Sequence, residues 1–222
     1  MRPRDRRRMA NQQPKIIGVC GGSGSGKTTL VRMLKERCRE LLGAELLVLQ
    51  VDHYYNDMAH LPEDERDARN YDHPDAFDTA LLGQHLSQLL AGKPVARPTY
   101  DYATHTRTAE TVQVNPAPII VLDGILTLHW PEIRELLTLS VYVDVDDDVR
   151  CLRRLRRDIR ERGRNVDGVI HQYLATVKPM HDSFIAPQKL VADIIVSWMN
   201  YNERAVAMLA GMVAAWGGEG SR

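Results

Sequence analysis

The stretch GGSGSGKTTL, residues 21–30, places four glycines and two serines directly before a lysine and two threonines. The preceding segment, residues 15–20 (KIIGVC), is a short apolar run rich in β-branched residues, which is typical of a buried strand. The following segment, residues 27–42, carries apolar side chains at helical spacing until Gly43 ends it. The stretch therefore predicts a tight loop that joins a buried strand to a helix, the basic unit of an α/β fold.

The loop also satisfies the phosphate-loop (P-loop) pattern G-x-x-x-x-G-K-[ST] through Gly21, Gly26, Lys27 and Thr28. Glycines let consecutive backbone N–H groups converge on an anion, and the positive N-terminal end of the helix adds to the attraction. Lys27 would reach the outer phosphates of a nucleotide, and Thr28 would offer its hydroxyl to a magnesium ion. A glycine-rich turn without a ligand is the alternative. The residues expected to hold the nucleotide are Gly21, Gly22, Ser23, Gly24, Ser25, Gly26, Lys27, Thr28 and Thr29.

Further apolar runs, separated by helical patterns, predict a parallel sheet with helices on both faces. The expected strands are residues 15–20, 45–51, 118–123, 139–144 and 191–196. The expected helices are residues 27–42, 79–90, 146–162, 166–184 and an amphipathic stretch around 206–216. Two short alternating segments within residues 94–114 predict a small β-hairpin inserted beside the sheet.

Composition narrows the class of protein. A chain of 222 residues with 44% hydrophobic and 26% charged residues is long enough for one domain with a proper core. The formal net charge of zero gives no overall attraction to nucleic acid or to an anionic membrane. Apolar runs stay well short of the roughly 18 to 20 residues of a membrane span. We therefore expect a cytoplasmic protein without a nucleic-acid or membrane partner.

The three cysteines, Cys20, Cys38 and Cys151, are far apart and fit neither a disulfide framework nor metal-ligand spacing. They are expected to be buried thiols. Residues 1–14 begin with the basic run RPRDRRR, which predicts a disordered extension in preference to a nucleic-acid-binding arm, because the run is short and has no interleaved aromatic residues.

Asp52 and Asp123 follow two of the predicted strands. Open α/β sheets bind ligands beyond the carboxyl ends of their strands, so one aspartate could accept a proton and the other could hold magnesium through water. An ordinary helix cap or turn is the alternative for each. Guanine specificity usually accompanies an N-K-x-D motif, and its absence from the sequence argues against a GTPase switch.

The segment RRLRRDIRERGR, residues 153–164, is dense in arginine. On a helix Arg154 and Arg157 share a face, and Gly163 leaves Arg162 and Arg164 beside a turn. A solvated helix face, a nucleic-acid-binding surface and a lid that closes over phosphates all fit this composition. The phosphate loop favours the lid, which would neutralise charge in the transition state and exclude water.

Together these pieces resemble the uridine kinase (uridine-cytidine kinase) family, a branch of the P-loop kinases related to phosphoribulokinase. The matching motifs are GGSGSGKTT, DHYY, NYDHPDAFD, PTYDYATHTR, LDGIL, RRLRRDIRERGR, QYLATVKPMHDSFIAP and ADIIV. They span about residues 15–196 in the family's order. The resemblance implies a P-loop NTPase-type α/β fold, with a single kinase domain over residues 15–222, a hairpin insertion over about 94–114 and a lid over about 146–165.

The resemblance also assigns roles. Asp52 would act as the base, and Tyr55 would shape its surroundings. Asp72 and Arg154 would hold the ribose hydroxyls, while Tyr100 and His105 would meet the pyrimidine. The implied catalytic residues are Asp52, Lys27, Arg157 and Arg162. The implied substrate-binding residues are Asp52, Tyr55, Asp72, Tyr100, His105, Arg154, Arg164 and Gln172. The implied magnesium site comprises Thr28, Asp52 and Asp123.

Two departures from the family pattern stand out. SWMNYN, residues 197–202, replaces the usual P-R-G-G-x-N turn near the donor base, so Trp198 or Tyr201 is predicted to stack on that base instead. Asp123 replaces a more usual glutamate, and we expect that the shorter carboxylate could still act on magnesium through water.

These inferences predict a magnesium-dependent kinase that transfers the γ-phosphoryl group of ATP to the 5′-hydroxyl of uridine or cytidine in pyrimidine salvage. The family suggests a homo-oligomer, with a homotetramer as the expected form. GTP as donor and the preference between uridine and cytidine stay open. Two alternatives also stay open: a kinase for another small acceptor, such as a ribulose phosphate or pantothenate, and a non-catalytic nucleotide- or RNA-binding protein.

Overall fold

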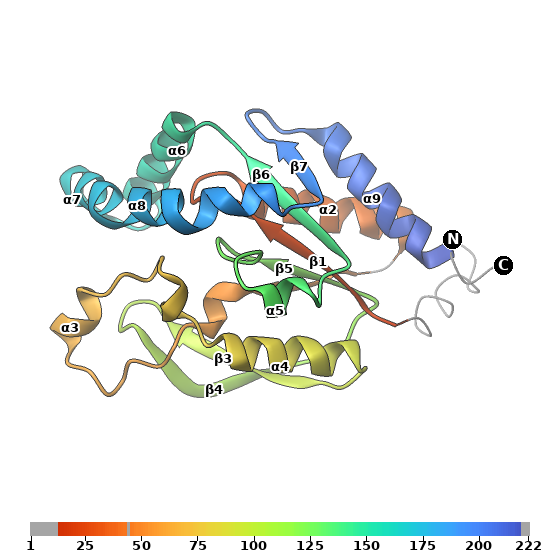
Figure 1. Cartoon of the computed structure of the whole chain (residues 1–222), viewed down its shortest axis with the longest axis horizontal. Helices are drawn as coiled ribbons and strands as arrows, with labels where there is room; N and C mark the ends of the chain where they lie inside the picture. The colour runs from red at the N-terminus through yellow and green to blue at the C-terminus, as the bar shows by residue number, and fades with distance from the viewer. Residues whose placement is uncertain (1–12, 44, 219–222) are drawn as a thin grey trace.

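Five parallel strands form the central sheet of the computed structural model, which describes residues 13–43 and 45–218 (Figure 1). Their order across the sheet is β2-β5-β1-β6-β7. The strands are β1 (Lys15–Cys20), β2 (Leu47–Gln50), β5 (Ile119–Asp123), β6 (Leu139–Asp144) and β7 (Ile194–Ser197). The predicted parallel sheet is confirmed. The last strand starts later than predicted because Asp193 accepts hydrogen bonds from the backbone and hydroxyl of Ser140 instead of joining the ladder.

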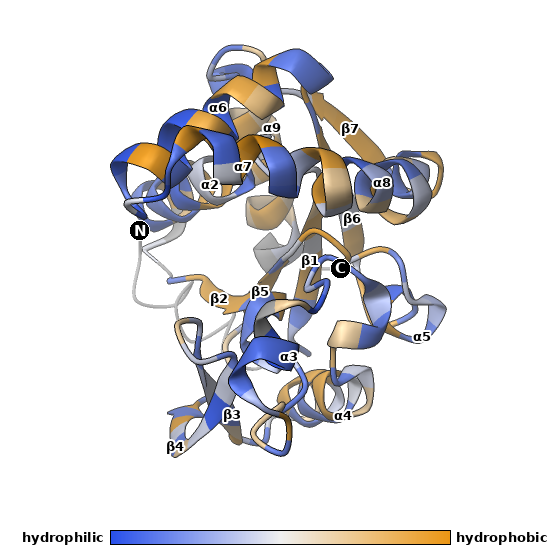
Figure 2. Cartoon of the chain, turned by 90° about the vertical axis from the view of Figure 1, so that its left-hand side faces the viewer, coloured by the Kyte–Doolittle hydropathy of each residue, from blue (hydrophilic) through white to orange (hydrophobic). Residues whose placement is uncertain are grey.

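Helices cover both faces of this sheet (Figures 1 and 2). Helices α2 (Lys27–Leu42) and α9 (Glu203–Gly218) share one core with Ile17 and Val19 of β1. Helices α4 (Thr79–Leu90) and α5 (Pro131–Arg134) lie over the other face, where their core includes Ile16. Alternate side chains of one strand thus enter opposite cores, which explains why the strands are apolar throughout.

The predicted hairpin is also confirmed, as strands β3 (Val95–Asp101) and β4 (Thr106–Val114). It belongs to the same core as α4. Arg107 of β4 fastens the hairpin to the segments after β2, because its Nε donates to the carbonyl of Tyr55 at 2.9 Å and its Nη2 pairs with Asp78 at 3.1 Å. The short helix α3 (Glu63–Asp67) lies in the same stretch of chain. The hairpin and this stretch together form one side of the site described below.

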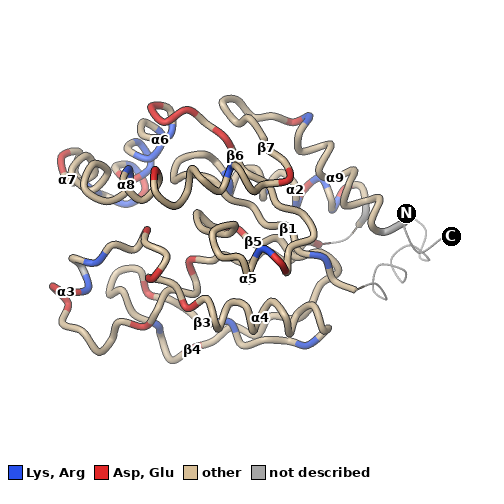
Figure 3. Tube along the Cα trace, in the orientation of Figure 1, with Lys and Arg blue, Asp and Glu red and all other residues tan. Residues whose placement is uncertain are grey.

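The arginine-dense segment forms α6 (Asp147–Arg160), which begins with acidic residues and ends with basic ones (Figure 3). This order of charges complements the helix dipole. After Gly163, helices α7 (Val166–Gln172) and α8 (Lys178–Met180) return toward the sheet, with π-helical turns before and after α8. The sequence predicted a helical stretch over residues 166–184, and the backbone is helical throughout it, with π-helical turns in place of a regular α-helix. Pro179 lacks a backbone N–H group and cannot donate to the preceding turn, which accounts for the irregularity.

Three remaining predictions have separate outcomes. Residues 1–12 of the expected basic extension lie outside the described residues. Within residues 13–43 and 45–218, helices long and apolar enough to cross a membrane are absent. Cys20 and Cys38 are buried as predicted, but Cys151 is only partly buried.

Candidate active site

The phosphate loop follows β1 and leads into α2. Gly24 and Gly26 adopt left-handed backbone conformations, with φ of 81° and 89°, that residues with a side chain rarely take. Gly26 is the N-cap of α2, and no side chain caps this end of the helix. Its first-turn N–H groups therefore remain available to an anion, as the loop pattern predicts.

Lys27, Thr28 and Asp123 meet at the start of α2. The Lys27 Nζ donates to the carbonyl oxygens of Gly21 at 2.8 Å and Gly22 at 3.2 Å. Thr28 Oγ1 donates to Asp123 Oδ2 at 3.3 Å, while the other carboxylate oxygen of Asp123 is buried without a hydrogen-bond partner. Burial raises the pKa of Asp123, against the opposing effects of Lys27 and Thr28. Mg²⁺ prefers oxygen ligands. The hydroxyl of Thr28 and the carboxylate of Asp123, one oxygen of which has no hydrogen-bond partner, therefore suit this ion.

Asp52 lies in the turn Val51–Tyr54, which follows β2 directly. The pairing of Gln50 with Asp123 across β2 and β5 brings this turn beside the phosphate loop. The pKa of Asp52 is raised to about 6, mainly by burial; Lys27 and Arg162 oppose the rise, and the charges of Asp123 and Asp72 add to it. Predicted site residues from four distant segments of the chain thus all influence the pKa of Asp52.

Aromatic side chains line the region beyond Asp52. Tyr55 stacks on Phe77 with ring centroids 4.4 Å apart and contacts Tyr100 at 5.2 Å. His105, at a φ of 55°, stacks almost parallel on Tyr71 at 4.2 Å. Tyr100 is only 5% exposed. Tyr71 was not among the predicted site residues, although it directly precedes Asp72 in NYDHPDAFD.

Arg154 joins three parts of the site. Its Nη1 donates to Ser23 Oγ of the phosphate loop at 2.9 Å, and its Nη2 donates to Gln172 at 3.1 Å. Gln172 also accepts a hydrogen bond from Arg164 at 2.7 Å. Burial raises the pKa of Asp72, and Arg154 is the strongest opposing charge. The lid helices, the phosphate loop and the residues predicted to bind the nucleoside therefore form one connected region.

A residue that the sequence analysis missed, Asp158, organises the lid arginines. Its side chain is 0% exposed and pairs with Arg157 at 2.8 Å, Arg154 at 3.5 Å, Arg162 at 3.6 Å and Arg164 at 3.9 Å. A signal was present, because Arg154, Asp158 and Arg162 recur every four residues and therefore share a helix face. Four like charges can gather here because one buried carboxylate lies among them.

Comparison with known proteins agrees with this geometry. Residues 16–205 match the model of the phosphoribulokinase/uridine kinase family. The chain belongs to this family. A family member named uridine kinase, from Ligilactobacillus salivarius (strain UCC118), is 51% identical over 203 residues, which cover 90% of this chain and 94% of that protein. A second uridine kinase, from Bacillus thuringiensis (strain Al Hakam), is 47% identical and covers 93% and 96%.

The fold is shared more widely within the family. The solved phosphoribulokinase from Rhodobacter spheroides superposes with a TM-score of 0.65 at 17% identity, covering 83% of this chain and 70% of that one. The family comparison and the sheet together confirm the predicted P-loop kinase fold and an ATP-dependent kinase.

The turn that departs from the family pattern corrects one expectation. Trp198 is 1% exposed and packs against Gly26, so it cannot stack on a donor base. Tyr201 is 72% exposed and remains available for such a contact. Arg153 of α6 secures the turn by donating to the carbonyl oxygens of Trp198 at 3.2 Å and Met199 at 2.6 Å.

Proposed function

We propose that this chain transfers the γ-phosphoryl group of ATP to the 5′-hydroxyl of uridine or cytidine and yields UMP or CMP. The observation that carries the proposal is the position of Asp52, which lies within the electrostatic influence of Lys27 and Arg162 and next to Tyr55. The uridine kinases that are about half identical over most of both chains support a pyrimidine nucleoside as acceptor.

On the donor side, the loop N–H groups and Lys27 bind the phosphates. The ammonium group of Lys27 donates to loop carbonyl oxygens in this structure. A bound triphosphate would offer this ammonium group a charged partner in place of those oxygens. Thr28, Asp52 and Asp123 would hold Mg²⁺, which when bound neutralises charge on the phosphates.

On the acceptor side, Asp52 takes the proton of the 5′-hydroxyl as its oxygen forms a bond to the γ-phosphorus. The bond from that phosphorus to the bridging oxygen of ADP breaks in the same in-line transfer. A carboxylate with a pKa of about 6 is a stronger base than an ordinary aspartate, yet it stays mostly ionised at pH 7.

The remaining residues fix the nucleoside and the lid. Asp72 and Arg154 would bind the ribose 2′- and 3′-hydroxyls, which favours ribonucleosides. Tyr100 and His105 would contact the pyrimidine, and Arg164 and Gln172 would complete the pocket. Arg157 and Arg162, held together by Asp158, would neutralise the charge that develops during transfer.

The deciding experiment measures ADP release from Mg-ATP with uridine, cytidine, thymidine, adenosine and ribulose 5-phosphate in turn, for the wild type and Asp52→Asn. We expect turnover with uridine and cytidine that collapses in the variant. Turnover only with ribulose 5-phosphate, or with none of these acceptors, would contradict the proposal.

Two finer points are tested separately. Replacing ATP by GTP in the same assay decides the donor, for which the protein is expected to prefer ATP. Light scattering coupled to size-exclusion chromatography tests the expected homotetramer, and a monomer at assay concentration would contradict that expectation.

A further inference from the structure

Two glycines of the phosphate loop pack against the same residue, Arg150 of α6. A Cβ atom built on Gly22 would lie 2.2 Å from Arg150 Nη1, and one built on Gly24 would lie 2.3 Å from the Arg150 carbonyl oxygen. Gly24 also needs its left-handed backbone, but Gly22 does not have a positive φ. Gly22 is therefore required for space rather than for conformation, because the guanidinium lies where a side chain would be.

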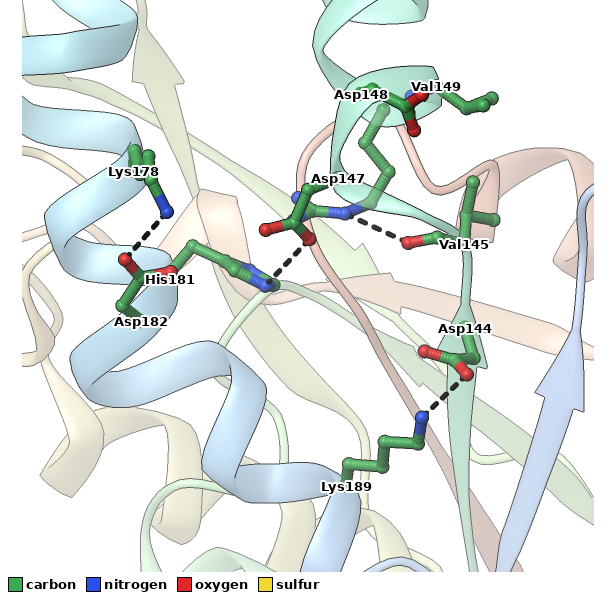
Figure 4. Close-up of polar contacts among 10 residues, drawn as sticks. Asp144, Val145, Asp147, Asp148, Val149, Lys178, His181, Asp182 and Lys189 are labelled. Atoms are coloured by element: carbon green, nitrogen blue, oxygen red, sulfur yellow. Dashed lines mark hydrogen bonds and ion pairs between the residues drawn. The ribbon is translucent and has the colours of Figure 1, made fainter.

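The guanidinium of Arg150 is held from several directions. Arg150 is 2% exposed, its Nε donates to the carbonyl oxygen of Val145 at 3.2 Å, and its Nη2 pairs with Asp147. Asp147 in turn faces His181 Nε2 at 3.8 Å (Figure 4). The other ring nitrogen of His181 lies 3.1 Å from the Cβ built on Gly22, so two side chains support the loop at this point.

This arrangement places a buried positive charge against the loop. The main partner of Arg150, Asp147, has a side chain that is 60% exposed, so water weakens its neutralising effect. A guanidinium is charged at every working pH and is rigid and planar, which suits a fixed support. Phosphate oxygens bound at the loop would therefore experience an additional cation beyond Lys27 and the lid arginines.

We infer that Arg150 is a positioning residue for the donor nucleotide: it holds the arc from Gly22 to Gly24 in the shape that binds phosphates and adds positive charge behind it. The inference deepens the proposed function and rests on the binding of a nucleoside triphosphate at this loop. It does not depend on which acceptor is phosphorylated. The role differs from those proposed for Arg154 and Arg157, which would contact the bound substrates directly, because Arg150 would act through the loop at Gly22 and Gly24.

The test uses Arg150→Met and Arg150→Lys, with Arg156→Met as a matched control, since Arg156 is exposed on the same helix. Calorimetry measures the Kd of a non-hydrolysable Mg-ATP analogue without any acceptor, and steady-state kinetics gives KM for ATP and for uridine. Arg150→Met should raise the nucleotide Kd and the KM for ATP about 10-fold or more, the loss expected for a charge-assisted contact, and leave the KM for uridine within about twofold. Arg150→Lys should recover part of the loss. Arg156→Met should match the wild type.

The pair Gly22→Ala and Gly22→Ala/Arg150→Met tests direct contact. The added methyl group collides with the guanidinium, so the single variant should bind nucleotide weakly, and the double variant should lose less than the two single losses combined. Independent losses, or an unchanged Kd in a folded Arg150→Met protein, would overturn the inference. Equal increases in the KM for ATP and the KM for uridine, together with a lowered Tm of Arg150→Met, would also overturn the inference. Wild-type protein that binds the analogue but phosphorylates no nucleoside would refute only the proposed function.

Discussion

The donor side and the acceptor side of this site are built from different materials. In the proposed function, the donor side is mostly main chain, from one continuous loop whose glycines and uncapped helix end would bind the phosphates. The acceptor side is mostly side chains, which surround Asp52 and Tyr55 and come from residues 70–77, the hairpin and the turn after α6. A polyphosphate carries charge that backbone N–H groups recognise in almost any context, whereas a neutral nucleoside needs hydroxyl and ring partners at separate places.

The largest expected effect comes from the carboxylate where the two sides meet. Asp52→Asn should lower kcat about 1,000-fold, because a positioned general base contributes on this scale. For the wild type, kcat/KM should fall as the pH drops below about 6, where Asp52 becomes protonated. Steady-state kinetics between pH 5 and 8 measures both effects. A wild-type kcat/KM that does not fall below about pH 6 would contradict the role of Asp52 as base.

Asp52 also gives a stability prediction. Its pKa is raised on folding from 3.8 to about 6, so the folded chain binds the proton more tightly than the unfolded chain. The ionised carboxylate therefore destabilises the fold above pH 6, and this penalty disappears as the pH falls below 4. Asp52→Asn should raise the free energy of unfolding by about 3 kcal/mol at pH 7.5 and by almost nothing at pH 3.5. Denaturant unfolding at the two pH values checks the sign.

On the donor side, Lys27→Met should lower kcat about 100- to 1,000-fold through lost stabilisation of transferring charge, and the KM for uridine should stay nearly constant. Lys35→Met, an exposed lysine on the same helix, is the control. A variant with an unchanged kcat and a raised KM for uridine would contradict the assignment of Lys27 to the donor side.

Asp158→Asn should affect both sides at once, because this carboxylate pairs with arginines that are proposed to contact the phosphates and the nucleoside. Removing one partner from a buried ionic cluster should destabilise the fold by about 3 kcal/mol, and misplaced arginines should lower kcat about 100-fold. Thermal unfolding and steady-state kinetics measure the two effects against Glu161→Gln, an exposed acidic neighbour. Normal kinetics in the Asp158 variant would show that the lid arginines do not need it.

The smallest effect should come from the edge of the acceptor side. His105→Ala removes a ring stacked on Tyr71 and a possible ligand hydrogen bond, so the KM for uridine should rise about 10-fold with the KM for ATP unchanged. His105→Asn, which tolerates the positive φ, separates the loss of the ring from backbone strain. An unchanged KM for uridine in both variants would remove His105 from the pocket.

Local patterns predicted most of the fold. The apolar runs of the strands, the Gly26–Lys27–Thr28 motif and the hairpin were readable because each depends on residues that are neighbours in the chain. The errors came where a distant residue intervened: Asp193 shortens β7 through Ser140, and Trp198 is buried against Gly26 rather than turned to the donor.

The sequence by itself determined the phosphate loop, because glycine conformation and an uncapped helix start are local properties. It also determined the family, through motifs in a fixed order. Only the tertiary structure decided which charges share a partner: Asp158 among its arginines, Asp52 near Lys27 and Asp72, and Arg150 against Gly22. The physical reason is that burial and through-space distance set the strength of charge interactions, and neither is encoded in the spacing of residues along the chain.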